Sequence, residues 1–189
     1  MHNASSQPPR ADHLAAWIAE EERLWGKQPA DAEPAPLNRA QLVGMNGLEV
    51  MQAMLRRELP APPIARTLDF VLIEVAYGRA VFQGRPGFAH YNPLGSVHGG
   101  WFATLLDSAL GCAVHTMMPP GRGYTTAELG INMVRSLTDK VLRVRAEATV
   151  IHCGRQLATA EARLVGPDGT LYAHGTTTCL VFEMPPRAG

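Results

Sequence analysis

Alternating hydrophobic and polar positions dominate the second half of the chain. Val71, Ile73 and Val75 are separated by residues of the other face, and the same period of two returns in four later segments. This period is typical of strands, in which successive side chains point to opposite faces. Gly78 and the run Pro167-Asp168-Gly169 predict turns between strands. The predicted strands lie within residues 71–75, 79–85, 125–133, 142–150, 156–165 and 171–182.

One segment between these strands has a different pattern. Residues Gly99–His115 (GGWFATLLDSALGCAVH) are apolar on nearly every face, which is typical of a helix enclosed by protein on most sides. Residues 86–98 contain two prolines and two glycines and are expected to form a long ordered loop. The predicted order is therefore β-β-α-β-β-β-β. It favours an α+β fold in which a curved antiparallel sheet wraps around one long central helix.

The first part of the chain has the pattern of a helical extension. Residues 1–10 are expected to be disordered. Asp12 is predicted to cap a short amphipathic helix that runs to Trp25 and ends at Gly26. Three prolines within residues 27–36 predict a connector without periodic structure.

A second short helix is predicted after this connector. It begins at Asn46 or Gly47 and ends before the prolines at positions 60, 62 and 63. Its apolar residues share one helical face, which must pack against another part of the protein. These residues are Leu48, Met51, Met54, Leu55 and Leu59. The chain thus divides into an N-terminal extension, residues 1–66, and a main domain, residues 67–184.

Composition and charge narrow the classes of function. The length of 189 residues suits one domain with a sizeable core and some additional chain. Because 17 Lys and Arg residues balance 17 Asp and Glu residues, the chain has no basic field to hold nucleic acid. No apolar run reaches the roughly 18 residues of a membrane span, and the start is unlike a signal peptide. We expect a soluble, cytoplasmic protein with neither a nucleic-acid nor a membrane partner.

The cysteines indicate neither a disulfide framework nor a metal site. There are three, an odd number, and they are far apart at positions 112, 153 and 179. Their surroundings are apolar or small, which favours buried, reduced thiols. No metal-ligand spacing is present, so no metal is expected.

Asp107 is the only Asp, Glu, Lys or Arg within the apolar helix. An unpaired carboxylate in such surroundings is strongly unfavourable unless it is hydrogen-bonded, protonated or in contact with water. One interpretation is a structural Asp that caps another part of the backbone. The other is a general base or nucleophile, since a carboxylate can activate water or attack an acyl carbon. The residue alone does not decide between them.

Gly99 and Gly100 begin the same helix, where N–H groups are free and the helix dipole is positive. They form a candidate oxyanion hole, with Gly100 as a substrate-binding residue, although paired glycines also serve tight turns and close packing. Gly99 and Asp107 lie about 12 Å apart along the helix axis, which a short side chain cannot span. If both act on one acyl carbon, each must come from a different protomer, and a dimer then has two equivalent sites.

Four polar residues near the helix are further candidates. Asn92 and His98 precede the glycine pair and can orient a water molecule or contact a carbonyl oxygen. Both also have structural interpretations, because Asn-Pro is a common turn pair and His often stabilises a helix start. Thr125 and Thr126 lead the next strand, where a hydroxyl can hold a nucleophilic water or the substrate, but Thr is also a favourable strand residue. The other histidines show no partner spacing.

Three sequence runs together resemble a known family. They are HYNPLGSVHGGWFATLLDSALG, GYTTAELGINMVR and VIHCGRQLATAEARL. The most specific part is N-P-x-G-x-x-H-G-G with an Asp seven residues beyond the last Gly, followed by T-x-E-L-x-I-N. Over about residues 68–183 the chain resembles the PaaI-type acyl-CoA thioesterases of the hotdog superfamily. The resemblance implies the hotdog fold, in which a curved sheet surrounds a central helix.

The resemblance also implies a reaction and a site. The reaction is hydrolysis of an aryl- or medium-chain acyl-CoA thioester, without a cofactor, at a site shared across a homodimer that often pairs into a tetramer. Asp107 corresponds to the catalytic carboxylate and the Gly99 amide to the donor that polarises the thioester carbonyl. Asn92 and His98 match supporting positions, and Thr126 matches a hydroxyl that places water or substrate.

The chain departs from the family pattern at Arg135-Ser136, where many relatives have Arg-Pro. This difference is expected to affect only a loop.

Two other functions remain as alternatives. A hotdog hydratase is the less favoured enzyme, because its Asp–His or His–Glu pair is not visible. A module that binds acyl-CoA without turnover is the second alternative. The sequence does not separate a nucleophilic from a general-base role for Asp107, and it does not fix the acyl group.

Overall fold

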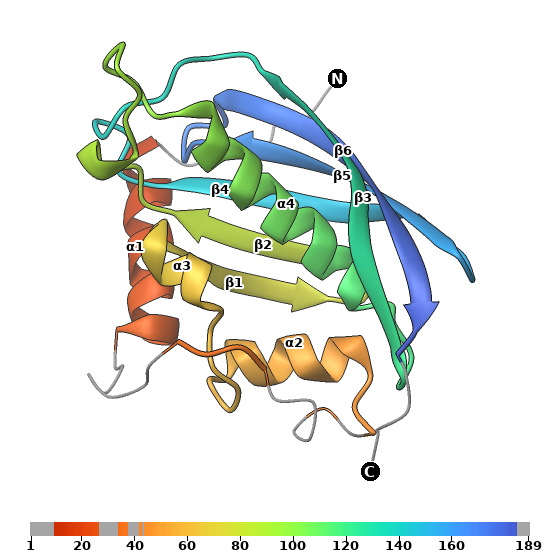
Figure 1. Cartoon of the computed structure of the whole chain (residues 1–189). Helices are drawn as coiled ribbons and strands as arrows, with labels where there is room; N and C mark the ends of the chain where they lie inside the picture. Colours follow the sequence, from red (N-terminus) through yellow and green to blue (C-terminus); the bar gives the residue numbers. More distant parts are fainter. Residues whose placement is uncertain (1–9, 27–33, 38–41, 43, 185–189) are drawn as a thin grey trace, which may run out of the picture.

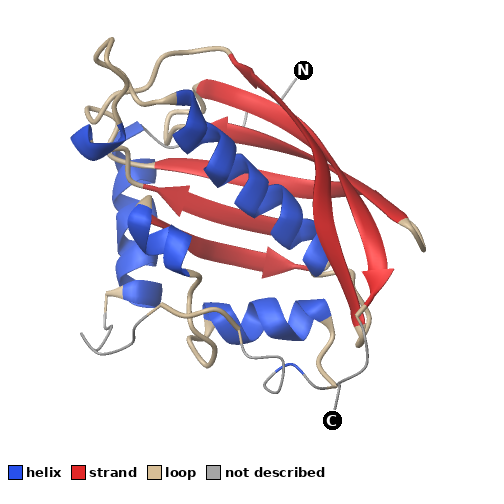
Figure 2. Ribbon diagram, in the orientation of Figure 1, coloured by secondary structure: helices blue, strands red, loops and turns tan. Residues whose placement is uncertain are grey.

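A single antiparallel sheet with one helix across its face forms the centre of the molecule (Figures 1 and 2). The computed structural model describes residues 10–26, 34–37, 42 and 44–184. The strand order is β1-β2-β4-β5-β6-β3, and every neighbouring pair is antiparallel. The strands are β1 (Phe70–Ala76), β2 (Arg79–Gly84), β3 (Arg122–Met133), β4 (Val144–Cys153), β5 (Leu157–Val165) and β6 (Leu171–Glu183).

The central helix α4 has the predicted bounds, Gly99–His115. The sheet curves around it, and α4 buries Leu105, Leu106 and Leu110 against the inner face. Small buried residues on the strands let the helix approach closely. They are Ala146, Ala148, Ala158, Ala160 and Ala162. The predicted α+β architecture, a curved antiparallel sheet around one long helix, is confirmed.

One detail of the strand prediction was wrong. Leu142 lies outside β4 and is half-exposed, because the strand begins only at Val144. The outer face of β2 is buried, since Val81 and Gln83 are both covered. The cover for Gln83 is helix α1 (Arg10–Trp25), whose Trp17 carbonyl and Glu21 carboxylate both accept from the Gln83 amide. Periodicity within one strand does not reveal a cover supplied by a distant segment.

Helix α1 therefore packs on the outer face of the sheet, opposite α4. The Glu21 carboxylate is buried and accepts from Gln83 at 2.7 Å and from Arg143 at 2.8 Å. Trp25 donates its indole N–H to the Leu72 carbonyl at 2.8 Å. Asp12 was expected at the N-cap, but it lies inside the first turn because the helix begins at Arg10. The predicted disorder of residues 1–10 was wrong at Arg10, which begins α1, while residues 1–9 and most of the predicted connector fall outside the described residues.

Helix α2 (Gly47–Leu55) starts where predicted. Asn46 caps it by accepting from the Glu49 amide at 2.9 Å, while the Glu49 carboxylate accepts from the Asn46 amide at 2.8 Å. This reciprocal pair is a capping box. A Cβ on Gly47 would overlap the His115 carbonyl, so the helix start fits against the end of α4 only as glycine.

The prolines do not end this helix. It ends at Leu55, and Arg57 follows in the left-handed region with φ of 65°. Leu59 lies beyond the helix, although its side chain is buried as expected. Pro63 instead begins a short helix, α3 (Pro63–Thr67), in agreement with the preference of proline for the first helical turn. The predicted domain boundary between residues 66 and 67 falls inside α3.

The loop between β2 and α4 contains a short 3-10 turn, η2 (Phe88–His90), and is otherwise irregular, as predicted. None of the described helices is both long enough and apolar enough to cross a membrane.

Candidate active site

Asp107 and Thr126 meet between α4 and β3. The Thr126 hydroxyl donates to Asp107 Oδ1 at 3.0 Å, and both side chains are half-buried. Asp107 is therefore neither unpaired nor fully enclosed in the single chain. A hydrogen-bonded carboxylate that keeps access to solvent can hold a water molecule or contact a substrate. Asp107 and Thr126 are therefore a candidate catalytic pair.

An irregularity in β3 brings Thr126 to this position. Thr126 lies opposite Cys179 of β6, but the next paired residue is Glu128, opposite Thr178. Ala127 is the extra residue of a β-bulge. The bulge changes the alternation, so that Thr126 and Leu129 both face α4 while Glu128 faces outward. The simple alternation seen in residues 128–133 does not reveal this change.

Thr125 lies on the opposite face of the sheet from this pair. It pairs with Leu180, whose side chain is 51% exposed on the outer face, whereas Thr126 pairs with the fully buried Cys179. Adjacent residues of a strand point to opposite faces. Within one chain the sheet separates Thr125 from Asp107, and the predicted role of Thr125 in binding substrate stays a prediction.

The two glycines at the start of α4 differ in their hydrogen bonding. His98 is the N-cap, and its Nδ1 accepts from the Gly100 amide at 2.8 Å. The Gly100 amide is thus engaged within the chain, and its role as a substrate-binding donor stays a prediction. No described residue accepts a hydrogen bond from the Gly99 amide. An added Cβ on Gly99 would lie 2.9 Å from both Sδ and Cε of Met133, so this thioether lies directly beside the glycine.

Asn92 organises the loop that leads into α4. Its Oδ1 accepts from the Leu94 amide at 2.9 Å, and its Nδ2 donates to Ser96 Oγ at 3.1 Å. These are the contacts expected of the structural interpretation. The supporting catalytic role of Asn92 stays a prediction, as does that of His98.

The predicted residues therefore form two groups within one chain. Asp107 lies at the middle of α4 with Thr126 of β3 beside it, whereas His98 and Gly99 lie at the start of α4 and Asn92 lies in the loop before it. All nine residues from Gly99 to Asp107 are helical, and the eight helical steps between them confirm a separation of about 12 Å along the axis.

The aromatic side chain beside the site of Asp107 was not predicted from the sequence. The Tyr124 ring packs against Gly111, one turn beyond Asp107, and an added Cβ there would lie 2.8 Å from the Tyr124 hydroxyl oxygen. A glycine inside a buried helix is costly, so Gly111 was the available signal for a close neighbour. The Tyr124 ring also lies 5.6 Å from the His115 ring, measured between centroids.

Burial controls the titration of the groups around the site. Burial raises the pKa of the Cys112 thiol to about 12, and the charge of nearby Asp107 adds to the rise. Burial likewise raises the pKa of Tyr124 well above its ordinary value and lowers that of His115. Burial also raises the pKa of Cys179, opposed by hydrogen bonding from Thr177 and Thr126. These groups are therefore neutral near pH 7.

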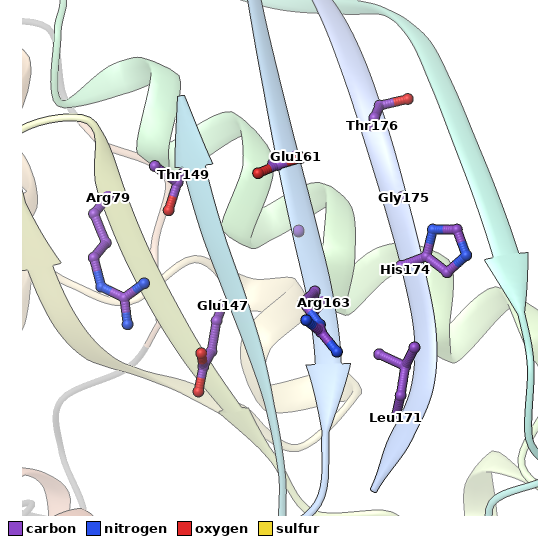
Figure 3. A pocket seen from close by; sticks show the side chains of 10 residues that line it. Arg79, Glu147, Thr149, Glu161, Arg163, Leu171, His174, Gly175 and Thr176 are labelled. Carbon is purple, nitrogen blue, oxygen red and sulfur yellow. The ribbon is translucent and has the colours of Figure 1, made fainter. Parts of the chain in front are cut away.

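The hollow in Figure 3 is a different feature. It has a volume of about 490 Å³ and lies on the outer face of the sheet, with α4 behind the strands in that view. Its walls carry charges of both signs, from residues that include Arg79, Glu147, Glu161 and Arg163. The sheet separates this hollow from Asp107. Among the described residues, no group of three His, Cys, Asp or Glu side chains is arranged to hold a metal ion.

The segment that contains Asp107 and Thr126 matches a known protein family. Residues 94–173 match the family model of the thioesterase superfamily. This part of the chain therefore resembles the thioesterase superfamily, and its fold is the hotdog fold. The matched segment contains the start of α4, Asp107 and Thr126, and the resemblance to PaaI-type thioesterases is confirmed.

Similar proteins place the hotdog domain among bacterial and archaeal relatives. The chain is 33% identical over 84 residues to a predicted esterase of Halobacterium salinarum, which is 43% of this chain and 54% of the relative. It thus spans about half the length of that curated relative.

Two solved structures share the hotdog domain more completely. A phenylacetic acid degradation-related protein of Ralstonia eutropha, described as a predicted thioesterase, is 29% identical with a TM-score of 0.63. The match covers 69% of this chain and 98% of that one. A variant of the phenylacetic acid degradation protein PaaI of Thermus thermophilus is 28% identical with a TM-score of 0.56, over 62% of this chain and 97% of that one.

Proposed function

We propose that the protein hydrolyses the thioester of an aryl- or medium-chain acyl-CoA to the free acid and CoA. The observation that carries this proposal is the hydrogen bond from Thr126 to Asp107 within a segment that matches the thioesterase superfamily. The names of the Ralstonia and Thermus proteins, which refer to phenylacetic acid degradation, support an aryl acyl group.

Asp107 supplies the chemistry in this proposal. As a general base, its carboxylate takes a proton from water while the water oxygen bonds to the thioester carbon. The C–S bond then breaks, and CoA leaves as a thiolate that takes up a proton. As a nucleophile, the carboxylate itself attacks the carbon, expels the thiolate and forms an anhydride that water hydrolyses. Both routes give the same products and use the same residue.

Thr126 orients the carboxylate in either route. Its donated hydrogen bond fixes one Asp107 oxygen, which leaves the other free to face water or substrate. Holding a reacting group in one orientation lowers the barrier to reaction.

A partner subunit completes the site in this proposal. Developing negative charge on the thioester oxygen needs a donor, and the Gly99 amide has no described partner but lies about 12 Å along α4 from Asp107 of the same chain. Among the described strands β3 is an edge of the sheet, and the face of α4 that carries Asp107 is only half-buried. A two-fold partner against β3 and α4 can supply the Gly99 amide, in a dimer or in a pair of such dimers.

The experiment compares hydrolysis of phenylacetyl-, benzoyl-, hexanoyl- and palmitoyl-CoA by the wild type, Asp107→Asn and Glu161→Gln. Free acid is measured by chromatography, so that protein thiols do not affect the readout. Asn keeps the shape of Asp107 and removes its charge, so turnover is expected to fall by a factor of about 10² or more. Glu161→Gln removes a carboxylate from the outer face and is the matched control.

Each outcome has a distinct meaning. Activity that is lost only in Asp107→Asn supports the proposal and ranks the substrates. Equal turnover in wild type and Asp107→Asn would remove Asp107 from the mechanism. CoA esters that bind without any hydrolysis would favour a binding module.

A further inference from the structure

A side chain of the neighbouring strand β6 contacts the bulge that presents Thr126 to Asp107. Thr177 of β6 lies opposite Leu129, on the inner face, and is only 1% exposed. Its hydroxyl donates to the backbone carbonyl of Glu128 at 2.8 Å. Glu128 is the residue at which pairing resumes after the extra residue Ala127. The hydrogen bond thus joins the side chain of Thr177 to the bulge itself.

The physical need for such a contact follows from the geometry of a bulge. An extra residue disrupts the ladder locally and leaves backbone groups without their usual partners. A buried backbone carbonyl without a donor is unfavourable, so a hydroxyl that reaches it stabilises one conformation of the bulge. Because β3 is an edge strand in the described sheet, its described partner in this region is β6 alone.

Cys179 connects Thr177 with the hydrogen-bonded pair of Thr126 and Asp107. Its fully buried thiol lies opposite Thr126, and its Sγ is 3.8 Å from Thr177 Oγ1. Thr177 and Cys179 are therefore neighbours on the inner face of β6. Thr177 contacts the carbonyl of the bulge, and Cys179 lies opposite Thr126. Figure 1 shows β6 and β3 running next to each other along this edge.

We propose that Thr177 is a positioning residue, which fixes the bulge of β3 so that the Thr126 hydroxyl meets the Asp107 carboxylate. This inference rests on the proposed function, because it assigns to Thr177 an effect on turnover through Thr126 and Asp107. Thr177 itself does not touch the substrate. Removal of the Thr177 hydroxyl therefore lowers kcat and leaves KM nearly unchanged, since the groups that bind the substrate are unaltered.

The test uses two substitutions of Thr177 and a control on the same strand. Thr177→Val keeps the shape and removes the donor, whereas Thr177→Ser keeps the donor. Thr178→Val makes the same change on the outer face, opposite Glu128. We expect kcat to fall about tenfold in Thr177→Val, with KM within about twofold, while Thr177→Ser and Thr178→Val stay close to wild type.

A double substitution separates positioning from a general loss of structure. If Thr177 acts through Thr126, then Thr177→Val has no further effect on kcat in a Thr126→Val background, because the coupled pair is already broken. Independent effects that multiply in the double variant would overturn the proposal. So would wild-type kcat in Thr177→Val, while loss of activity in Asp107→Asn would show that the proposed function itself holds.

Crystal structures of the wild type and Thr177→Val give a readout that needs no activity. Loss of the hydrogen bond between Thr126 Oγ1 and Asp107 Oδ1 in the variant supports the inference, even if no acyl-CoA is hydrolysed and the proposed function fails. An unchanged bond in the variant overturns it.

Discussion

The hydroxyl of Thr126 lies 3.0 Å from Oδ1 of Asp107 and joins the edge strand β3 to the central helix α4. Thr125, its neighbour in sequence, pairs with Leu180 on the opposite face of the sheet. Two adjacent threonines therefore offer a matched comparison, in which the chemical change is the same and only the face of the sheet differs.

Thr126→Val is expected to lower kcat by about tenfold, because the Asp107 carboxylate loses the donor that orients it. Thr125→Val is expected to leave kcat unchanged. Steady-state kinetics with the best acyl-CoA of the panel checks both variants. Equal losses in the two would show that the strand, rather than the Thr126 hydroxyl, determines the effect.

The sequence allowed the fold and part of the site to be predicted, for identifiable reasons. The helix Gly99–His115 was predicted with its observed bounds because apolar residues on all faces and a glycine start are local signals. The Asp107–Thr126 contact was not predictable from periodicity, since it depends on a bulge at Ala127. The engagement of the Gly100 amide by His98 depends on a side-chain rotamer, which no pattern specifies.

Gly111→Ala is expected to destabilise the protein by about 1–3 kcal/mol, although Ala is normally the better helix former. The added methyl group would lie 2.8 Å from the Tyr124 hydroxyl oxygen and 3.1 Å from Cε2 of the same ring. Denaturant unfolding measures the change. In a Tyr124→Leu background the same substitution should cost nothing or stabilise the helix, and a persistent loss there would contradict the steric explanation.

Glu21→Ala is expected to lower the free energy of unfolding by about 3–5 kcal/mol, as when one partner of a buried ion pair is removed. The substitution leaves the amide of Gln83 and the guanidinium of Arg143 without the carboxylate that now accepts from both. Glu22→Ala, an exposed position on the same helix, is the control with the same change in side chain. Similar unfolding curves for the two variants would show that α1 does not depend on the buried carboxylate.

His115 should make stability depend on pH below neutrality. Burial lowers the pKa of the folded ring from its ordinary value of 6.5. The unfolded chain therefore binds more protons than the folded chain as the pH falls through 6.5, and the free energy of unfolding decreases. His115→Gln should lose less stability than the wild type between pH 7 and about pH 5.5. Parallel stability curves for the two proteins would assign the acid sensitivity to other groups.

In the proposed site, Asp107 of one subunit and the Gly99 amide of its partner act on the same thioester. Gly99→Pro removes that amide and keeps the helix start, since proline suits the first helical position and His98 before it is extended, with ψ of 139°. Alone, Gly99→Pro and Asp107→Asn are each expected to be inactive. Heterodimers of the two, isolated with different affinity tags, contain one intact site of two and should recover about half of the wild-type activity. Heterodimers as inactive as the parent variants would contradict a shared site.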